Sequence, residues 1–267
     1  MRMLMEYKII SGRTEEIRRV MMDRGRQQFR RGTKVRKRSS LRKILQNERE
    51  AGKNLARLLN CNFDKGDLWV TLTYPTEPES WEEAEDNLRR FIRKLKREYE
   101  RKTGKKLRYV FSHGKKGKDG MPTRMHHHLV LPAMDYEIIT QLWPADDVTY
   151  RKLDGRGDYT GVARYMIQNA GHDIPGAQKY HPSRGLKKPV YTEPVPVFKT
   201  SERIRVPREA KVQERAEWQD METGMFGAYV RYTRPRRGND TSSDSTSSAR
   251  RGRAPSPRGE GIGVKNC

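Results

Sequence analysis

Short strand-like runs and helical segments follow one another in a fixed order through the middle of the chain. Residues 67–74 alternate, are rich in β-branched and aromatic side chains, and stop at Pro75, which is typical of a strand. Residues 107–113 and 124–131 are two further runs, and the Gly- and Lys-rich connection between them indicates a β-hairpin with a long loop. With the helices the order is β, α, β, β, α, α. Pairing the strands into one antiparallel sheet with helices on one face gives an α+β fold.

Capping signals and periodicity predict the helices. Ser80 followed by Glu83 forms a capping box, and the apolar residues after it recur on one helical face. Acidic residues gather at the start of this helix and basic residues at its end, which the helix dipole favours. Further helices are predicted at residues 40–59, 135–142, 159–169 and, as an exposed helix, 209–221.

The positive charge of the chain points to a polyanionic partner. Its 57 Lys and Arg against 34 Asp and Glu give a formal charge of +23, which suits nucleic acid. Apolar residues make up 33% and charged residues 34% of the chain, so we expect part of it to lie outside the core. Basic residues are densest between residues 24 and 43, and the Ser-, Gly-, Arg- and Pro-rich residues 233–267 predict a disordered tail.

Missing signals exclude several classes of function. The sequence has no GxxxxGK[ST] loop, so it does not carry its own P-loop motor. No run approaches the roughly 18 to 20 apolar residues that span a bilayer, and we expect a cytoplasmic protein without a membrane partner. Cys61 and Cys267 are too few for a disulfide framework or a zinc ribbon. Any metal would therefore be held by His and carboxylates.

Three consecutive histidines lie in the last predicted strand of the hairpin. Because alternate side chains of a strand share a face, His126 and His128 are expected on one face, about 6.5–7 Å apart at Cα. Two imidazoles at that separation can converge on one divalent cation. The alternative is a partly exposed strand end on which the histidines are coincidental. His113 closes the partner strand and is a candidate third ligand, although it could equally be structural.

Tyr165 lies in the predicted helix 159–169 and is a candidate nucleophile. A phenol can attack a phosphodiester if a metal ion activates the phosphate, because its pKa is near 10. Gln168 is three residues further along and is expected on the same helical face. Most helical tyrosines are packing residues, so the helix alone is a weak signal.

The strand 68–74, the His126-His127-His128 strand and the later Tyr165 helix resemble, in order and spacing, the three motifs of HUH endonucleases. The rolling-circle replication initiators of small phages and plasmids, of the filamentous-phage and microvirus type, are the most similar. The resemblance covers roughly residues 35–190. It implies a five-stranded antiparallel sheet in an RRM-like α+β fold, and Mg²⁺ or Mn²⁺ held by His126 and His128.

Four segments are then expected. They are a basic N-terminal arm and helix at 1–60, the HUH core at 61–190, a Pro-rich and helical extension at 191–232, and the disordered basic tail at 233–267.

The resemblance also assigns residues, with some departures. Tyr165 matches the nucleophilic tyrosine, and His113 stands where many relatives place a Glu. Some relatives carry a second tyrosine where this chain has Gly161, which implies a single-tyrosine enzyme. Relatives tend to have Lys at the positions of Arg164 and Gln168. The residues expected to contact nucleic acid are Arg36, Lys37, Arg38, Lys115, Lys116, Arg164, Gln168, Arg184 and Lys187.

The function expected from these features is rolling-circle replication initiation in a bacterial host. The chain would nick and rejoin single-stranded DNA at an origin through a 5′-phosphotyrosyl link, with a host helicase and DNA polymerase as partners. The same chemistry in transposition or plasmid mobilisation is a close alternative. A non-catalytic RRM-like nucleic-acid binder is another, although the sequence lacks the aromatic RNP1 run of such modules.

Overall fold

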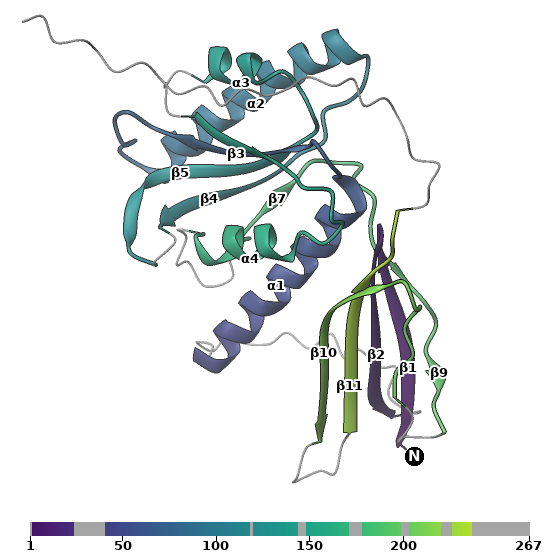
Figure 1. Cartoon of the computed structure of the whole chain (residues 1–267). Helices are drawn as coiled ribbons and strands as arrows, with labels where there is room; N and C mark the ends of the chain where they lie inside the picture. The colour runs from purple at the N-terminus through teal and green to yellow at the C-terminus, as the bar shows by residue number, and fades with distance from the viewer. Residues whose placement is uncertain are drawn as a thin grey trace, which may run out of the picture. The chain divides into compact units, whose positions relative to one another are not determined.

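The computed structural model describes residues 2–23, 41–117, 120–143, 148–170, 178–198, 203–219 and 226–236. Residues up to Pro235 form one compact unit. Its described part contains two antiparallel sheets and four helices (Figure 1). The α+β class predicted from the sequence is confirmed.

A five-stranded antiparallel sheet carries the histidine triplet. Its strands lie in the order β6 (Val148–Lys152), β3 (Leu68–Thr73), β5 (Pro122–Leu131), β4 (Val110–Lys116) and β7 (His181–Pro182). The predicted hairpin is present as β4 and β5, and both strands run further into the connection than expected. The sequence reasoning missed the edge strands β6 and β7, which are short and largely exposed.

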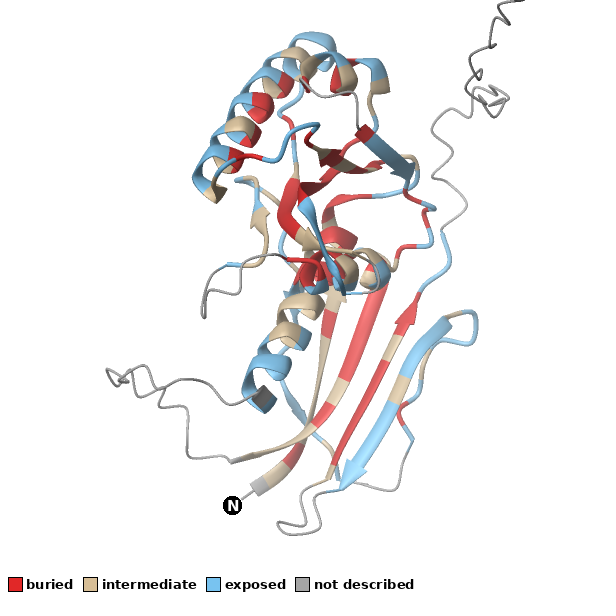
Figure 2. Ribbon diagram, turned by 90° about the vertical axis from the view of Figure 1, so that its left-hand side faces the viewer, coloured by how far each residue is buried: buried red, intermediate tan, exposed pale blue. Residues whose placement is uncertain are grey.

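Helices cover both faces of this sheet, so the expectation of helices on one face is wrong (Figure 1). Helices α2 (Trp81–Thr103) and α3 (Tyr136–Leu142) pack against one face, and helices α1 (Leu41–Asn62) and α4 (Thr160–Gln168) against the other. The reason is visible in β5, where every residue from 125 to 131 is buried (Figure 2). A strand buried on both faces needs cover on both sides.

Helix α2 shows how local signals fix one of these elements. Its N-cap Ser80 accepts a hydrogen bond from the Glu83 amide at 3.2 Å. The Glu83 carboxylate accepts from the amide of Glu79 instead of that of Ser80, so the capping box is only half formed. Gly104 ends the helix at φ 65, where glycine is favoured, and its N–H donates to the Glu100 carbonyl at 2.8 Å.

The sequence did not predict the second sheet. It begins with a hairpin of β1 (Arg2–Ser11) and β2 (Thr14–Asp23), where an arm had been expected. Gly12 forms the turn at φ 60, and a Cβ there would lie 2.1 Å from the Asn60 carbonyl oxygen. The turn therefore requires glycine and contacts the end of α1 closely.

The C-terminal half of the second sheet corrects another prediction. Residues 211–219 form strand β10 (Lys211–Gln219), not an exposed helix, and pair with β11 (Phe226–Thr233), which in turn pairs with β2. The Glu-, Arg- and Ala-containing sequence favours a helix locally, but pairing along the whole of β11 overrides that preference. Short strands β8 (Val190–Tyr191) and β9 (Val195–Pro196) pair with β1.

Several expectations lie outside the described residues. They include the contacts of Arg36, Lys37 and Arg38 and nearly all of the tail at 237–267. The four-segment division remains a prediction. Among the helices that the structure describes, none has the length and apolar content needed to cross a bilayer.

Candidate active site

His126 and His128 lie on the face of β5 that α4 covers. The sheet register places Thr71 of β3 beside His128 and Gly114 of β4 beside His126. The two Nε2 atoms are 3.1 Å apart, and the ring centroids 4.7 Å. The alternation predicted from the sequence therefore brings both imidazoles to one point.

The other ring nitrogens of this pair hold hydrogen bonds that orient the rings. His126 Nδ1 is 2.9 Å from the Arg124 carbonyl oxygen, which can only accept, so Nδ1 carries the hydrogen and Nε2 has a free lone pair. His128 Nδ1 is 3.0 Å from Thr71 Oγ1, which can accept or donate. A metal-binding histidine normally donates its second N–H to such a partner. The donor set therefore fits a divalent cation held by two Nε2 atoms.

Burial keeps both imidazoles neutral, the form that binds metal. Burial lowers the pKa of His126 despite the Arg124 carbonyl, which opposes the shift. Burial, and then the positive charge of a protonated His126, lower the pKa of His128 to about 3. Desolvation favours the uncharged form of a histidine. At neutral pH the pair therefore presents lone pairs without first losing protons.

Gly114 provides the space that the His126 ring occupies. A Cβ on Gly114 would lie 2.2 Å from His126 Nε2 and 2.7 Å from two ring carbons. The glycine in the hairpin is therefore required by the close approach of the imidazole to the neighbouring strand.

His113 does not join this pair. Its register partner is His127, and the two Nδ1 atoms are 2.9 Å apart on the opposite face of the sheet. The expected third ligand is thus on the wrong side, because a shift of one residue in strand register moves a side chain to the other face. The described residues contain no group of three His, Cys, Asp or Glu side chains that could hold a metal.

His127 anchors the triplet in the core on that opposite face. Tyr74 donates its hydroxyl hydrogen to the Ala84 carbonyl at 3.0 Å, and its oxygen lies 2.6 Å from His127 Nε2. The one consistent pattern has His127 Nε2–H donating to Tyr74 and His113 Nδ1–H donating to His127 Nδ1. This chain of hydrogen bonds fixes which way β5 faces, and so points His126 and His128 toward α4.

Tyr165 of α4 lies against the histidine pair. Its ring centroid is 5.1 Å from that of His128 and 5.3 Å from that of Trp69, both in edge-on contacts. The side chain is half-buried, so solvent reaches it. Tyr159, the alternative nucleophile, is 3% exposed, and its buried hydroxyl has no hydrogen-bond partner in the described part of the chain. Only Tyr165 of these two is accessible.

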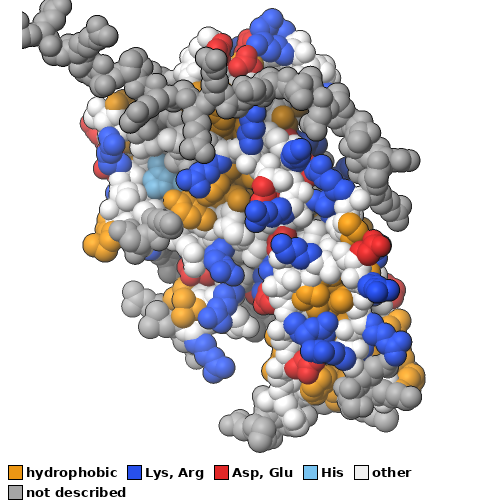
Figure 3. All heavy atoms as spheres, in the orientation of Figure 1, with side chains coloured by type: hydrophobic (Ala, Val, Ile, Leu, Met, Phe, Trp, Pro, Cys, Tyr) orange, Lys and Arg blue, Asp and Glu red, His pale blue; other side chains and the backbone are white. Residues whose placement is uncertain are grey.

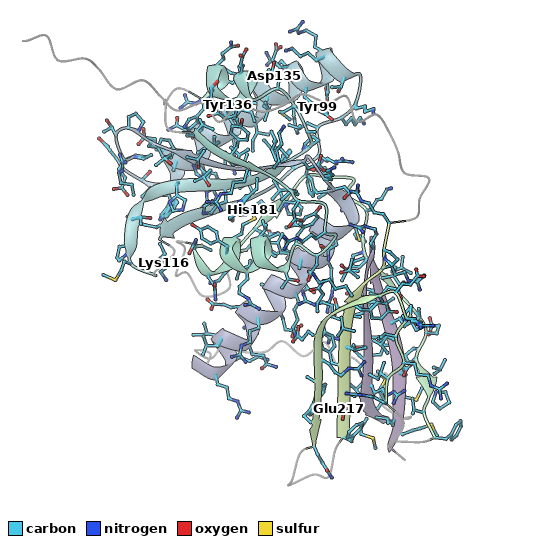
Figure 4. The ribbon with its side chains drawn as sticks, in the orientation of Figure 1. Tyr99, Lys116, Asp135, Tyr136, His181 and Glu217 are labelled. Atoms are coloured by element: carbon cyan, nitrogen blue, oxygen red, sulfur yellow. The ribbon has the colours of Figure 1, made fainter. Side chains whose placement is uncertain are left out.

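A pocket of about 620 Å³ contains the two histidines and Tyr165. Three cationic side chains line it, those of Lys116, Arg124 and Arg151, and none of its described lining residues is acidic. Figure 4 shows Lys116 at the end of β4. The remaining polar lining residues are Thr71, Thr73, Thr123, Thr149 and Tyr150. Such a pocket attracts an anion and offers it many hydroxyl groups.

Part of this lining was missed by the sequence reasoning. Trp69, Thr71 and Thr73 alternate along a strand that was identified, and antiparallel pairing with His126 and His128 would have placed them on the same face. Arg151 lies on β6, a strand that was not predicted.

Other residues expected to bind nucleic acid lie elsewhere. Arg164 and Gln168 line a different pocket, so Gln168 does not share the face of Tyr165 as expected. Lys115 forms an ion pair with Glu77 at 3.5 Å. Arg184 is exposed, and the backbone of Lys187 is hydrogen-bonded at both N–H and carbonyl by the Asn62 side chain.

Comparison with known proteins agrees with this geometry. Residues 67–170 match the model of the Replication-associated protein ORF2 family. The matched range spans the strands, the histidine triplet and the Tyr165 helix described above. No curated protein and no solved structure gives a significant match. The match confirms the resemblance seen in the sequence: residues 67–170 are a region of the Replication-associated protein ORF2 family, which supports a role in initiating rolling-circle replication of a phage or plasmid.

Proposed function

We propose that this chain is a single-tyrosine HUH endonuclease that nicks and rejoins single-stranded DNA at a replication origin. The observation that carries the proposal is the contact of Tyr165 with His128 inside a cation-lined pocket. A nucleophile, a two-nitrogen metal site and phosphate-attracting side chains thereby occupy one cavity. Each group comes from a different element of the family-matched region.

The chain's residues have distinct tasks in the cleavage step. A divalent cation held by His126 and His128 would supply positive charge to a non-bridging oxygen of the scissile phosphate. Lys116, Arg124 and Arg151 hold the neighbouring backbone by charge. The Tyr165 oxygen forms a bond to phosphorus as the bond to the 3′-oxygen breaks. The phenol loses its proton and the departing 3′-oxygen gains one, so a 5′-phosphotyrosyl link and a free 3′-OH result.

Reversal of the same step rejoins a strand. A 3′-OH attacks the phosphotyrosyl phosphorus, the bond to Tyr165 breaks, and the phenol recovers its proton. The covalent link conserves the energy of the phosphodiester, so no nucleotide cofactor is needed. The lack of a P-loop in the sequence is consistent with unwinding by a host helicase, with a host polymerase extending the 3′-OH.

The donor set predicts a preference between the two candidate metals. Mg²⁺ prefers oxygen ligands, whereas Mn²⁺ accepts imidazole nitrogen more readily. Two nitrogen ligands without a carboxylate in the described residues therefore favour Mn²⁺. Phosphate and water oxygens would complete its coordination.

Covalent capture tests the proposal. The purified chain is incubated with Mn²⁺ or with a chelator and a randomised, fluorescent single-stranded DNA pool, and adducts are separated on a denaturing gel. We expect adducts only with metal, their loss in Tyr165→Phe, and their retention in Tyr150→Phe, which removes another hydroxyl from the same pocket. Adducts in Tyr165→Phe, or binding without cleavage in every sample, would contradict the proposal.

A further inference from the structure

Helix α4 separates the histidine pocket from a second pocket of about 580 Å³. Tyr165 lines the first pocket, whereas its neighbour Arg164 and Gln168 line the second. The other walls of the second pocket come from α1 and from strands β2, β10 and β11. Neither the family match, which ends at residue 170, nor the cleavage chemistry assigns this pocket a role.

The acidic residues of the second pocket are already neutralised. Glu16 accepts two hydrogen bonds of 2.6 Å from the Arg57 guanidinium. Although burial alone would raise the pKa of Glu16, Arg57 outweighs it and lowers this pKa. Glu48 pairs with Lys179 at 2.6 Å, and Glu214 with Arg231 at 3.5 Å. These carboxylates therefore offer little to a cationic or neutral partner.

Two arginines of this pocket keep their charge available. Arg49 and Arg164 are exposed, and neither has an ion pair or side-chain hydrogen bond within the described residues. An adjoining hollow, lined by Arg42, Leu45, Gln46 and Arg49, extends the basic surface along α1. Arg42 and Arg49 are seven residues apart, so they lie on one side of the helix, about 10 Å apart along its axis.

This basic surface continues outside the pocket. Figure 3 shows Lys and Arg side chains along α1 and on the neighbouring second sheet. Guanidinium groups spaced along a helix, with the amides of Gln46 and Gln168 between them, match the repeating phosphates of a nucleic-acid backbone. They offer no pattern of base readout.

We propose that Arg42, Arg49, Arg164 and Gln168 form a second DNA-binding surface, which holds the sugar–phosphate backbone of the DNA flanking the cleavage site. The inference rests on the proposed nicking function and adds a surface to it. Because Arg164 and Tyr165 are consecutive residues of a nine-residue helix, DNA bound on this surface would also steady the helix that carries the nucleophile.

Length-dependent binding tests this surface. Fluorescence anisotropy measures the affinity of wild type and of Arg49→Ala/Arg164→Ala for a captured DNA sequence with progressively longer flanks, made single- or double-stranded in separate arms. The control Arg93→Ala/Arg97→Ala removes the same charge from exposed positions of α2. We expect wild type and control to gain affinity with flank length and the test variant to lose that gain.

The salt dependence gives the magnitude. Loss of two phosphate contacts lowers the slope of log affinity against log salt by about 1.4 for single-stranded and about 1.8 for duplex flanks. The arm in which the slope falls identifies the bound form. Full length-dependent gain in the test variant, or equal loss in the control, would overturn the inference.

The outcome is separable from that of the nicking proposal. Adduct formation on the shortest cleavable oligonucleotide should be equal in wild type and in Arg49→Ala/Arg164→Ala. If adducts depend on Tyr165 but flank binding is unchanged in the variant, the second surface is refuted and nicking stands. If flank binding is lost while no protein forms adducts, the surface stands and nicking is refuted.

Discussion

Gly114→Ala should disable the metal site without changing any polar residue. The added Cβ would lie 2.2 Å from His126 Nε2, whereas ordinary contact begins at 3.4 Å, so the ring must retreat by about 1.2 Å. The ring cannot keep both its hydrogen bond to Arg124 and its 3.1 Å approach to His128 after such a shift. A displacement of about 1 Å can cost roughly 100-fold in rate. Overpacking should also cost about 1–3 kcal/mol of unfolding free energy.

Two measurements follow this perturbation, and one needs no DNA. Titration calorimetry with Mn²⁺ should show binding in wild type and a large loss of affinity in Gly114→Ala. Adduct formation should slow by about 100-fold. Gly161→Ala is the matched control, because a Cβ at that exposed position of α4 meets nothing within 4 Å. Unchanged Mn²⁺ affinity in Gly114→Ala, or equal loss in Gly161→Ala, would refute the reasoning.

The remaining predictions concern ligand choice, pH and the join between the two sheets. His126→Ala should abolish Mn²⁺ binding, whereas His113→Ala should leave a measurable site because His113 faces the opposite side of the sheet; the reverse order in calorimetry would contradict the pairing. Since His128 has a folded pKa of about 3, the unfolded chain binds more protons between pH 6.5 and 3, and stability must fall as pH falls. This side chain alone should cost about 2 kcal/mol by pH 5 in chelator, and chemical denaturation that is equally stable at pH 7 and 5 would refute it. Arg57→Ala leaves Glu16 buried and unpaired, so urea unfolding should show a loss of about 3–5 kcal/mol, and a loss below about 1 kcal/mol would show that the pair is not buried in solution.

The sequence predicted those parts of the fold that local patterns determine. Ser80 and the apolar face after it located α2 to within a residue, and alternation put His126 and His128 on one face. Both results depend only on the periodicity of a single element. They were enough to place the two imidazoles and, with the helix pattern, Tyr165.

Features that depend on pairing between distant segments could not be read in this way. His113 was misplaced because its face depends on the register of β4 against β5, which is irregular between Gly114 and Lys116. Strand β10 has a sequence that favours a helix and becomes a strand only through pairing with β11. Gln168 was placed beside Tyr165 from helical spacing, but the packing of α4 between two pockets turns it away.

The measurement that tests the central claim most directly is the identity of the residue that becomes attached to DNA. Adducts formed with Mn²⁺ are digested with nuclease and protease, and the peptide that retains a nucleotide is sequenced by mass spectrometry. The account predicts a nucleotide on Tyr165, joined through a 5′-phosphate. A nucleotide on another residue, or metal-dependent cleavage that leaves every peptide unmodified, would contradict it.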